Sequence, residues 1–488
     1  MLFNSAIFIF VFLPLCLAGW YGLNHFGLYR PALWFLSISS LIFYGYFHPA
    51  YLLLILASVL INYGVLRAIL RFRKASKLLL ALGVLANLGI LGYFKYCDFF
   101  LSTVNGITGS NIPLRNILLP LGISFYTLQQ LSCLTDAYRG KESDYRFDEY
   151  LTFVTFFPQL IAGPIVLSEE LIPRFRDLSL RRFDAESFAS GLSLFILGLA
   201  KKVLVADLFG RVVDFGFEKI YWIDTASAWV VGLCYSIQLY FDFSGYCDMA
   251  RGLAEMFRFP LPENFAQPFK AFSIKDHWDR WHMTLTRFFT RYVYIPLGGS
   301  RKGRIRTAVN IFLVFAVSGL WHGAAWTYLI WGALQGVGVL WSRRKFLRLK
   351  PGVLSWFFTF SFIVASQLIF RSGDLDFMRR MLTAMFTPKG VHFLPELASC
   401  LAEAPEFYMI TRAAEALAPG ALNALYLILL ALMLLVAALL LRGRNAAKLC
   451  ADAKAAAYPK RFIWLLALLF TAVVVSLNQV STFLYFNF

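Results

Sequence analysis

Charged residues are scarce in this chain. Asp, Glu, Lys and Arg make up 15% of its 488 residues, whereas a soluble protein of this size carries about 25%. Apolar runs of roughly 18 to 22 residues recur from one end to the other, a length that spans a hydrocarbon core. No stretch is polar enough to form a soluble domain. The scarcity of charge excludes a soluble globular protein and predicts an all-α polytopic membrane protein.

Acidic residues are scarcer than basic ones, 28 against 46, which gives a formal net charge of +18. The basic residues gather in short loops, and this positive-inside pattern places those loops in the cytoplasm. Such clusters also bind anionic lipid headgroups. We therefore expect membrane lipids, and no nucleic acid, as partners. The basic loops are 67–77, 173–182, 301–306, 342–350 and 442–461.

Several chemical signatures are missing. The seven cysteines form no CxxC pair and no Cys/His ligand spacing, so we expect buried thiols rather than disulfides. His277 and His282 stand five residues apart, about 140° around a helix, whereas a helical zinc pair shares one face. A GxSxG elbow, a GxGxxG loop and a Walker motif are also missing, which leaves an acyl-serine enzyme and nucleotide-driven transport without support. We predict no metal site and no bound cofactor.

Apolar segments separated by the basic loops predict about 11 to 12 transmembrane helices. With the basic loops in the cytoplasm, the path is consistent and leaves both ends of the chain outside. The candidate spans are 5–22, 31–47, 51–70, 78–98, 117–135, 188–214, 226–244, 307–322, 325–341, 353–370, 421–441 and 462–484.

One apolar segment, residues 150–166, differs from a plain span because Pro158, Gly163 and Pro164 interrupt it. Both of its flanks are polar, so we expect a re-entrant hairpin. Its broken backbone must then be buried in protein or line a cavity, because lipid offers no hydrogen-bond partners.

Two further stretches combine charge with apolar surroundings. Lys201 and Lys202 interrupt an apolar run, so either the span bends there or the ammonium groups face an interior cavity or the inner surface. Residues 240–303 interleave aromatic side chains, carboxylates and arginines, which predicts short helices at the cytoplasmic boundary. Within them, Asp276 and Arg280 have the i,i+4 spacing of an ion pair.

One histidine, His322, lies in the stretch SGLWHGAAW between two apolar runs. An ionisable group at membrane depth is costly and by default indicates a functional site. The flanking Trp321 and Trp326 exclude water and favour the neutral imidazole, which is the form that acts as a base. The small residues around it allow another backbone or a substrate to approach closely. By spacing alone, a histidine at the turn between two spans is an equally good interpretation.

Read together, these stretches resemble the membrane-bound O-acyltransferase family. The similarity covers nearly the whole chain and favours the bacterial branch that acylates alginate and teichoic acids. The family pattern typically has an acidic residue before the run YxYIPLGG, where this chain has Thr290 and Arg291. The matching stretches are RWHMTLTRFFTRYVYIPLGGSRKG (280–303), SGLWHGAAWTYLIWGALQG (318–336), 119–140, 156–166, 240–254, 261–269 and the terminal FLYFNF.

The resemblance implies a helical core with a re-entrant segment and cytoplasmic interfacial helices. It implies acyl transfer to a hydroxyl, with His322 as the catalytic histidine and His282 as a second catalytic position on the cytoplasmic side. The candidate substrate-binding residues are Trp278, Arg280, Trp281, Trp321, Trp326 and Asp242. We expect one polytopic acyltransferase domain, 1–488, with N-terminal spans at 5–135, the re-entrant segment at 150–166, a catalytic core at 188–341 and C-terminal spans at 353–484.

For the bacterial branch, the resemblance implies an acyl group, expected to be acetyl, from a cytoplasmic thioester. Acetyl-CoA is the expected donor, and its phosphates suit the basic loops. The implied acceptor is an extracytoplasmic polysaccharide of alginate, cellulose or peptidoglycan type, reached through a periplasmic or membrane-anchored polysaccharide acetyltransferase. The implied location is the bacterial inner membrane.

Two alternatives stay open at this point. The first alternative is a transporter or flippase of an acylated lipid or glycan, with His322 as a proton relay. The second is an enzyme that acylates lipids or proteins, as eukaryotic relatives do.

The depth of His322 sets a requirement on an acyltransferase. A straight helix from Arg306 carries His322 roughly 24 Å from the inner boundary of a core about 30 Å thick. A cytoplasmic thioester reaches it only through a passage in the protein. We expect the donor to pass the 275–295 segment, the acceptor to come from outside, and the 150–166 segment to line part of the wall.

The orientation can be tested by thiol labelling. We expect 67–77, 342–350 and 442–461 to be cytoplasmic, because their positive charge resists translocation. In a cysteine-free variant, a single cysteine at position 73 should resist an impermeant thiol reagent in whole cells, whereas one at position 110 should be labelled. Strong labelling at position 73 would reverse the predicted orientation.

Overall fold

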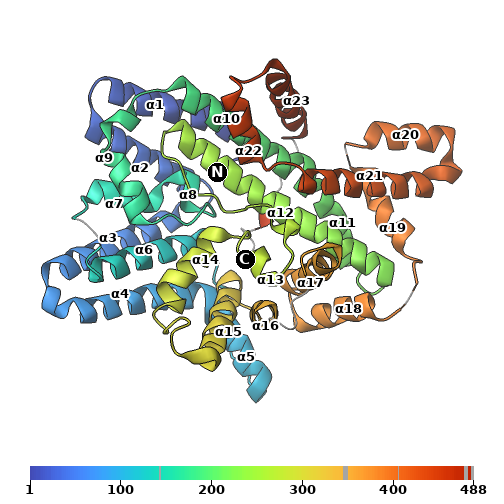
Figure 1. Ribbon diagram of the computed structural model, residues 1–488, viewed down its shortest axis with the longest axis horizontal. Helices are drawn as coiled ribbons and strands as arrows, with labels where there is room; N and C mark the ends of the chain where they lie inside the picture. The colour runs from blue at the N-terminus through green and yellow to red at the C-terminus, as the bar shows by residue number, and fades with distance from the viewer. Residues whose placement is uncertain (142–143, 344–349, 389, 405, 478–481, 485–488) are drawn as a thin grey trace.

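The computed structural model describes residues 1–141, 144–343, 350–388, 390–404, 406–477 and 482–484. In this part of the chain every regular element is a helix, as the sequence predicts (Figure 1). Four of the helices have π geometry: η1 (Phe8–Phe12), η3 (Gly92–Tyr96), η5 (Lys201–Ala206) and η7 (Thr290–Tyr294).

The α-helices divide into three groups along the chain. The N-terminal group is α1 (Leu13–His25), α2 (Tyr29–Gly45), α3 (Ala50–Arg71), α4 (Ser76–Leu91), α5 (Cys97–Thr108), α6 (Ile123–Tyr138), α7 (Phe147–Thr155), α8 (Phe157–Leu160) and α9 (Ser168–Arg176). The central group is α10 (Ala185–Ala200), α11 (Asp207–Glu218), α12 (Thr225–Met256), α13 (Ile274–Trp278), α14 (Met283–Phe289), α15 (Gly303–His322) and α16 (Trp326–Ser342). The C-terminal group is α17 (Val353–Arg371), α18 (Leu375–Phe386), α19 (Leu394–Ser399), α20 (Tyr408–Leu417), α21 (Leu422–Arg442), α22 (Ala446–Ala455) and α23 (Lys460–Ser476). Short 3-10 turns join them: η2 (Arg73–Ala75), η4 (Leu178–Arg181), η6 (Pro268–Lys270), η9 (Cys400–Glu403) and η10 (Pro419–Ala421).

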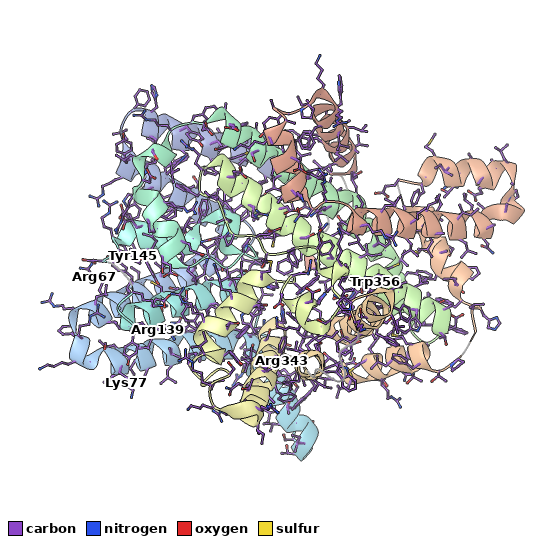
Figure 2. All side chains as sticks on the ribbon, viewed as in Figure 1. Arg67, Lys77, Arg139, Tyr145, Arg343 and Trp356 are labelled. Atoms are coloured by element: carbon purple, nitrogen blue, oxygen red, sulfur yellow. The ribbon has the colours of Figure 1, made fainter. Side chains whose placement is uncertain are left out.

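Six helical stretches in the described residues are long and apolar enough to cross a membrane. They are Phe8–His25, Ala50–Arg71, Arg73–Thr108, Gly303–His322, Val353–Arg371 and Pro419–Arg442. Some of the other predicted spans correspond to shorter helices, such as the 17-residue α16, whereas 226–244 lies within the 32-residue α12. The full count of 11 to 12 stays a prediction. Figure 2 shows Arg67, Lys77 and Arg139 at the same end of α3, α4 and α6, as the predicted orientation requires.

The 32-residue α12 crosses the middle of the molecule (Figure 1). It joins two apolar cores: its buried residues up to Phe243 pack with the C-terminal group, and those from Met249 onward pack with the N-terminal group. It also lies very close to α10, because a Cβ atom on Gly198 would stand 2.6 Å from the Gly245 carbonyl oxygen. Glycine is required at this crossing, where the backbones themselves are in contact.

The hairpin of α15 and α16 packs in the same way. A Cβ atom on Gly319 would lie 2.2 Å from the Tyr328 carbonyl oxygen and 3.1 Å from Cα of Gly332. The small residues of the stretch SGLWHGAAW therefore bring two helix backbones together, as the sequence indicates. The close approach holds His322, at the end of α15, against the start of α16.

The segment 150–166 is interrupted where its prolines and glycine predict. Helix α7 ends at Thr155, Phe156 turns the chain with ψ 107°, and α8 covers four residues including Pro158. Every residue from 150 to 166 is buried. The broken backbone is thus enclosed by protein, which was the condition for placing it at membrane depth.

Lys201 and Lys202 begin the π-helix η5 and both turn into the protein. Lys201 Nζ lies 2.5 Å from Asp248, while Lys202 Nζ lies 2.6 Å from Asp242 and 2.7 Å from Asp207. Of the arrangements left open by the sequence, the ammonium groups adopt the interior one. Each is stabilised there by a carboxylate partner.

The segment after α12 packs along α15. Near the basic loops, the Phe269 carbonyl accepts a hydrogen bond from Trp356 Nε1 at 2.8 Å. Further along, the ring of His282 lies 6.2 Å from that of Trp321, in the last turn of α15. That turn is about 28 Å along the helix from Gly303. Aromatic residues of this segment are buried between α12, α15 and α16, and its place at the cytoplasmic boundary stays a prediction.

The α15–α16 crossing makes a stability prediction. Gly319→Ala should destabilise the protein by about 1–3 kcal/mol, because a methyl group would force two backbones apart. The control is Gly64→Ala on α3, where a Cβ atom meets nothing within 4 Å. Thermal melting of the detergent-purified protein should separate the two variants, and equal melting temperatures would contradict the close packing.

Candidate active site

His322 is the last residue of α15 and is only 5% exposed. Its ring is enclosed by aromatic rings from three directions. Centroid distances are 5.0 Å to Trp321, 5.4 Å to Trp331 on α16 and 5.4 Å to Phe370 on α17. Trp321 belongs to the N-terminal apolar core, whereas Trp331 and Phe370 belong to the C-terminal one. The histidine therefore lies at the seam between the two cores.

Two cavities meet at His322. The first, here called the Lys95 cavity, is lined by Lys95, Leu119, Pro120, Leu121, Gly122, Ile123, Ser124, Phe125, Ile161, Trp321 and His322. The second, the Trp278 cavity, is lined by Leu239, Phe243, His277, Trp278, Trp281, His322, Trp331, Gln335, Ile363, Gln367 and Phe370. His322 is the residue common to both, and Ile161 brings the interrupted 150–166 segment into the wall.

The end of α15 is held by a segment that the sequence analysis passed over. Lys95 Nζ donates hydrogen bonds to the carbonyl oxygens of Trp321 at 2.6 Å and His322 at 3.1 Å. The Tyr96 hydroxyl donates to the preceding carbonyl, that of Leu320, at 2.6 Å. Three consecutive carbonyls at the helix C-terminus are satisfied in this way, and the cation complements the negative end of the helix dipole.

The signal for this contact is the polar pair KY inside the apolar run GYFKYCDFF. Its effect depends on the π-helix η3, which contains both Lys95 and Tyr96. π-helical turns of this kind occur mostly at functional sites.

His282 is placed beside His322 by a tight turn before α14. The two imidazole centroids are 6.2 Å apart. His282 has φ +46°, a left-handed conformation that is strained for a residue other than glycine. Its Nδ1 lies 3.2 Å from Oδ1 of Asn264. Burial lowers the pKa of His282 to about 3, so the ring is neutral at physiological pH.

His277, which the sequence analysis treats as an interfacial residue, is also buried and lines the Trp278 cavity. Its Nδ1 donates to the Pro268 carbonyl oxygen at 3.2 Å, and its ring stacks on Trp281 with centroids 5.5 Å apart. Burial lowers its pKa to about 4. His277 lies on α13 and His282 precedes α14, so the two histidines do not share a face of one helix.

The remaining candidate residues divide into two sets. Trp278, Trp281 and Trp321 line the two cavities. Arg280, Trp326 and Asp242 line neither of them. Arg280 forms the predicted ion pair with Asp276 at 2.7 Å, which is confirmed. Trp326 is 43% exposed and packs on Phe99.

Asp242 lies deeper in the protein but is engaged elsewhere. Its carboxylate pairs with Lys202 and accepts from the backbone N–H of Leu484 at 3.1 Å. The next residue on α12, Phe243, does line the Trp278 cavity. The local sequence does not show which of these two neighbours faces that cavity.

The comparisons with known proteins bear on this geometry. The family model of MBOAT, the membrane-bound O-acyltransferase family, matches residues 32–370. This chain belongs to the membrane-bound O-acyltransferase family. It is therefore a multi-pass membrane protein and an acyltransferase.

The chain is similar to three transferases whose names give different polymers. The chain is 40% identical to the peptidoglycan O-acetyltransferase of Helicobacter pylori over 442 residues, which are 83% of each chain. It is 40% identical to a probable alginate O-acetylase of Pseudomonas aeruginosa over 399 residues, 79% of this chain and 75% of the relative. It is 27% identical to the teichoic acid D-alanyltransferase of Streptococcus thermophilus, over 56% of this chain and 71% of the relative.

Thr290 and Arg291 stand where the family pattern typically has an acidic residue, and the structure shows acidic partners for Arg291. The Arg291 guanidinium lies 2.5 Å from Glu169 and 2.7 Å from Asp136, which ties η7 to α9 and α6. The hydrogen bond from Arg291 lowers the pKa of the Glu169 carboxyl. An arginine at this position of the acyltransferase is thus matched by two carboxylates.

Lys95 is the basis of a further prediction. Lys95→Met should lower acyl transfer about 100-fold, because the last turn of α15 loses its cap and a shift of about 1 Å at His322 is enough for such a loss. The matched control is Lys77→Met at the exposed start of α4, in the same helical stretch. Acyl transfer by equal amounts of folded protein is the measurement. Wild-type activity of Lys95→Met would show that acyl transfer does not need the Lys95 cap of α15.

Proposed function

We propose that this acyltransferase takes an acetyl group from a cytoplasmic thioester, acetyl-CoA, and transfers it toward an extracytoplasmic polysaccharide. The names of the relatives support this proposal, since two of them at 40% identity are an O-acetyltransferase for peptidoglycan and a probable one for alginate. Accordingly, the chain resides in the bacterial inner membrane, and a periplasmic or membrane-anchored acetyltransferase completes delivery to the polymer.

The observation that carries the proposal is the position of His322 between two cavities. Acyl transfer to a hydroxyl needs a base for the proton and a site from which water is excluded. A neutral imidazole enclosed by Trp321, Trp331 and Phe370 meets both needs. In this assignment the thioester comes through the Trp278 cavity and the acceptor hydroxyl comes through the Lys95 cavity.

The donor route is supported by a third cavity, which lies between α14, α15 and α16. Lys275 and Arg343 line it together with Trp278, which also lines the Trp278 cavity. Lys275 is paired with Asp279 of the same wall at 2.5 Å, and Arg343 adds a second positive charge, which suits the phosphates of coenzyme A. Figure 2 labels Arg343 close to α15. The donor thus enters from the side of the basic loops, with its thioester end directed toward His322.

His282 takes the role of a second catalytic group on the donor side. Its neutral ring and its position 6.2 Å from the ring of His322 support this assignment. The alternative of a transporter with His322 as a proton relay loses its basis, because the family is one of acyltransferases. Acylation of lipids or proteins is disfavoured by the polysaccharide acetylases among the relatives.

The histidines provide the test. His322→Ala should lower acetyl transfer about 1,000-fold, within the range of a lost general base. His282→Ala should lose activity chiefly at subsaturating donor. Acetyl transfer from radiolabelled acetyl-CoA, by purified protein in liposomes at several donor concentrations, measures both effects.

The control for these variants is His277→Ala, which removes a buried histidine from the wall of the Trp278 cavity. It should lose far less activity, because its ring is held by Pro268 and Trp281 rather than facing His322. An active His322→Ala variant would overturn the proposed function. A loss for His277→Ala as large as that for His282→Ala would remove the distinction between the two residues.

A further inference from the structure

Asn264 lies at the centre of the turn that carries His282. Its side chain is 1% exposed. Its Oδ1 atom stands within hydrogen-bond distance of three groups of the turn: Thr284 Oγ1 at 2.9 Å, the Thr284 backbone N at 3.2 Å and His282 Nδ1 at 3.2 Å. The backbone carbonyl of Asn264 also accepts from the N–H of Met283 at 3.0 Å. One residue therefore holds three consecutive positions of the turn.

The orientation of the Asn264 amide follows from these partners. A backbone N–H only donates, so the side-chain atom that faces the N–H of Thr284 must be the oxygen. The amide nitrogen then lies on the other side, where it donates to Cys247 Sγ at 3.3 Å. Because the oxygen only accepts, His282 Nδ1 must donate to it. The proton of the neutral imidazole is consequently on Nδ1, and Nε2 keeps its lone pair.

The backbone of the turn needs this support. His282 has φ +46°, and a residue other than glycine in this region costs about 1–2 kcal/mol. Thr284 links the turn onward, because its hydroxyl accepts from the N–H of Ile165 at 3.0 Å in the interrupted segment. The hydrogen bonds of Asn264 thus offset the strain and join the turn to the wall of the site.

We propose that Asn264 is a positioning residue that fixes His282 in the Nδ1–H tautomer and in its orientation beside His322. This inference rests on the proposed function and extends it to the side chain that prepares the second histidine. Through Asn264, the Nε2 atom of His282 is the nitrogen that accepts a proton or a hydrogen bond during acyl transfer. Asn264 itself touches neither substrate.

The charged surroundings make the proposal testable by pH. The titratable His322 from α15 and Cys247 from α12 face this turn, and the rings of Phe243, Phe265 and Trp321 pack against His282. Burial holds the pKa of His282 near 3, so its protonation lies below the working pH range. A carboxylate placed at Oδ1 would favour the imidazolium and raise that pKa.

The decisive variant is Asn264→Asp, which has the same shape and can accept the same three hydrogen bonds. We expect its acetyl transfer to approach wild-type levels at high pH. Because a neighbouring carboxylate stabilises protonated His282, the acetyl transfer of this variant should fall on the acid side of the working pH range, where the wild type stays active. Asn264→Leu removes the acceptor and should, like His282→Ala, lose activity chiefly at subsaturating donor, with kcat/KM for acetyl-CoA lowered about 100-fold at every pH.

The matched control is Asn87→Asp, a buried asparagine that is hydrogen-bonded to Asn62 between α3 and α4. It introduces a buried carboxylate away from the site and should keep the wild-type pH profile. A wild-type pH profile in folded Asn264→Asp would overturn the proposal, and so would a wild-type kcat/KM for acetyl-CoA in Asn264→Leu. His322→Ala, assayed in parallel, separates the two levels: if it is active the proposed function fails, and if it is inactive while Asn264→Asp keeps the wild-type pH profile only the role of Asn264 fails.

Discussion

The structure of this acyltransferase depends on the need to satisfy polar groups where water is excluded. A helix that ends inside the protein leaves its last carbonyls without intrahelical partners. In α15 these carbonyls belong to Leu320, Trp321 and His322, and the side chains of Lys95 and Tyr96 satisfy them. Without such a cap, the helix end that carries the histidine would be costly to bury. With it, an imidazole is held between two apolar cores.

The same requirement explains the other polar features of the interior. Lys202 is paired with Asp242 and Asp207, and Asn264 satisfies the strained turn at His282. The interrupted segment 150–166 is enclosed by protein along its whole length. Irregular backbone and ionisable groups are therefore found where protein partners exist, which is also where cavities reach the centre of the molecule.

Close helix packing gives the site its rigidity. Glycines bring α15 onto α16 and α12 onto α10 until backbone atoms are in contact. Such contacts leave little freedom for the helices to slide, so the rings around His322 keep their positions. Acyl transfer benefits from this, because a base is effective only when it is held within hydrogen-bond reach of the proton it removes.

The sequence by itself determined the features that depend on local composition. The length of the apolar runs, the basic loops, the prolines within 150–166 and the ion pair of Asp276 with Arg280 were predictable, because each arises from neighbouring residues. The motif around His322 also identified the family. The packing of the 264–282 segment along α15, the cap by Lys95, the contacts of Asn264 and the engagement of Asp242 with Lys202 were decided by tertiary structure alone. These contacts join residues from about twenty to more than two hundred positions apart, and no local pattern specifies which buried polar group will find which partner when the helices pack.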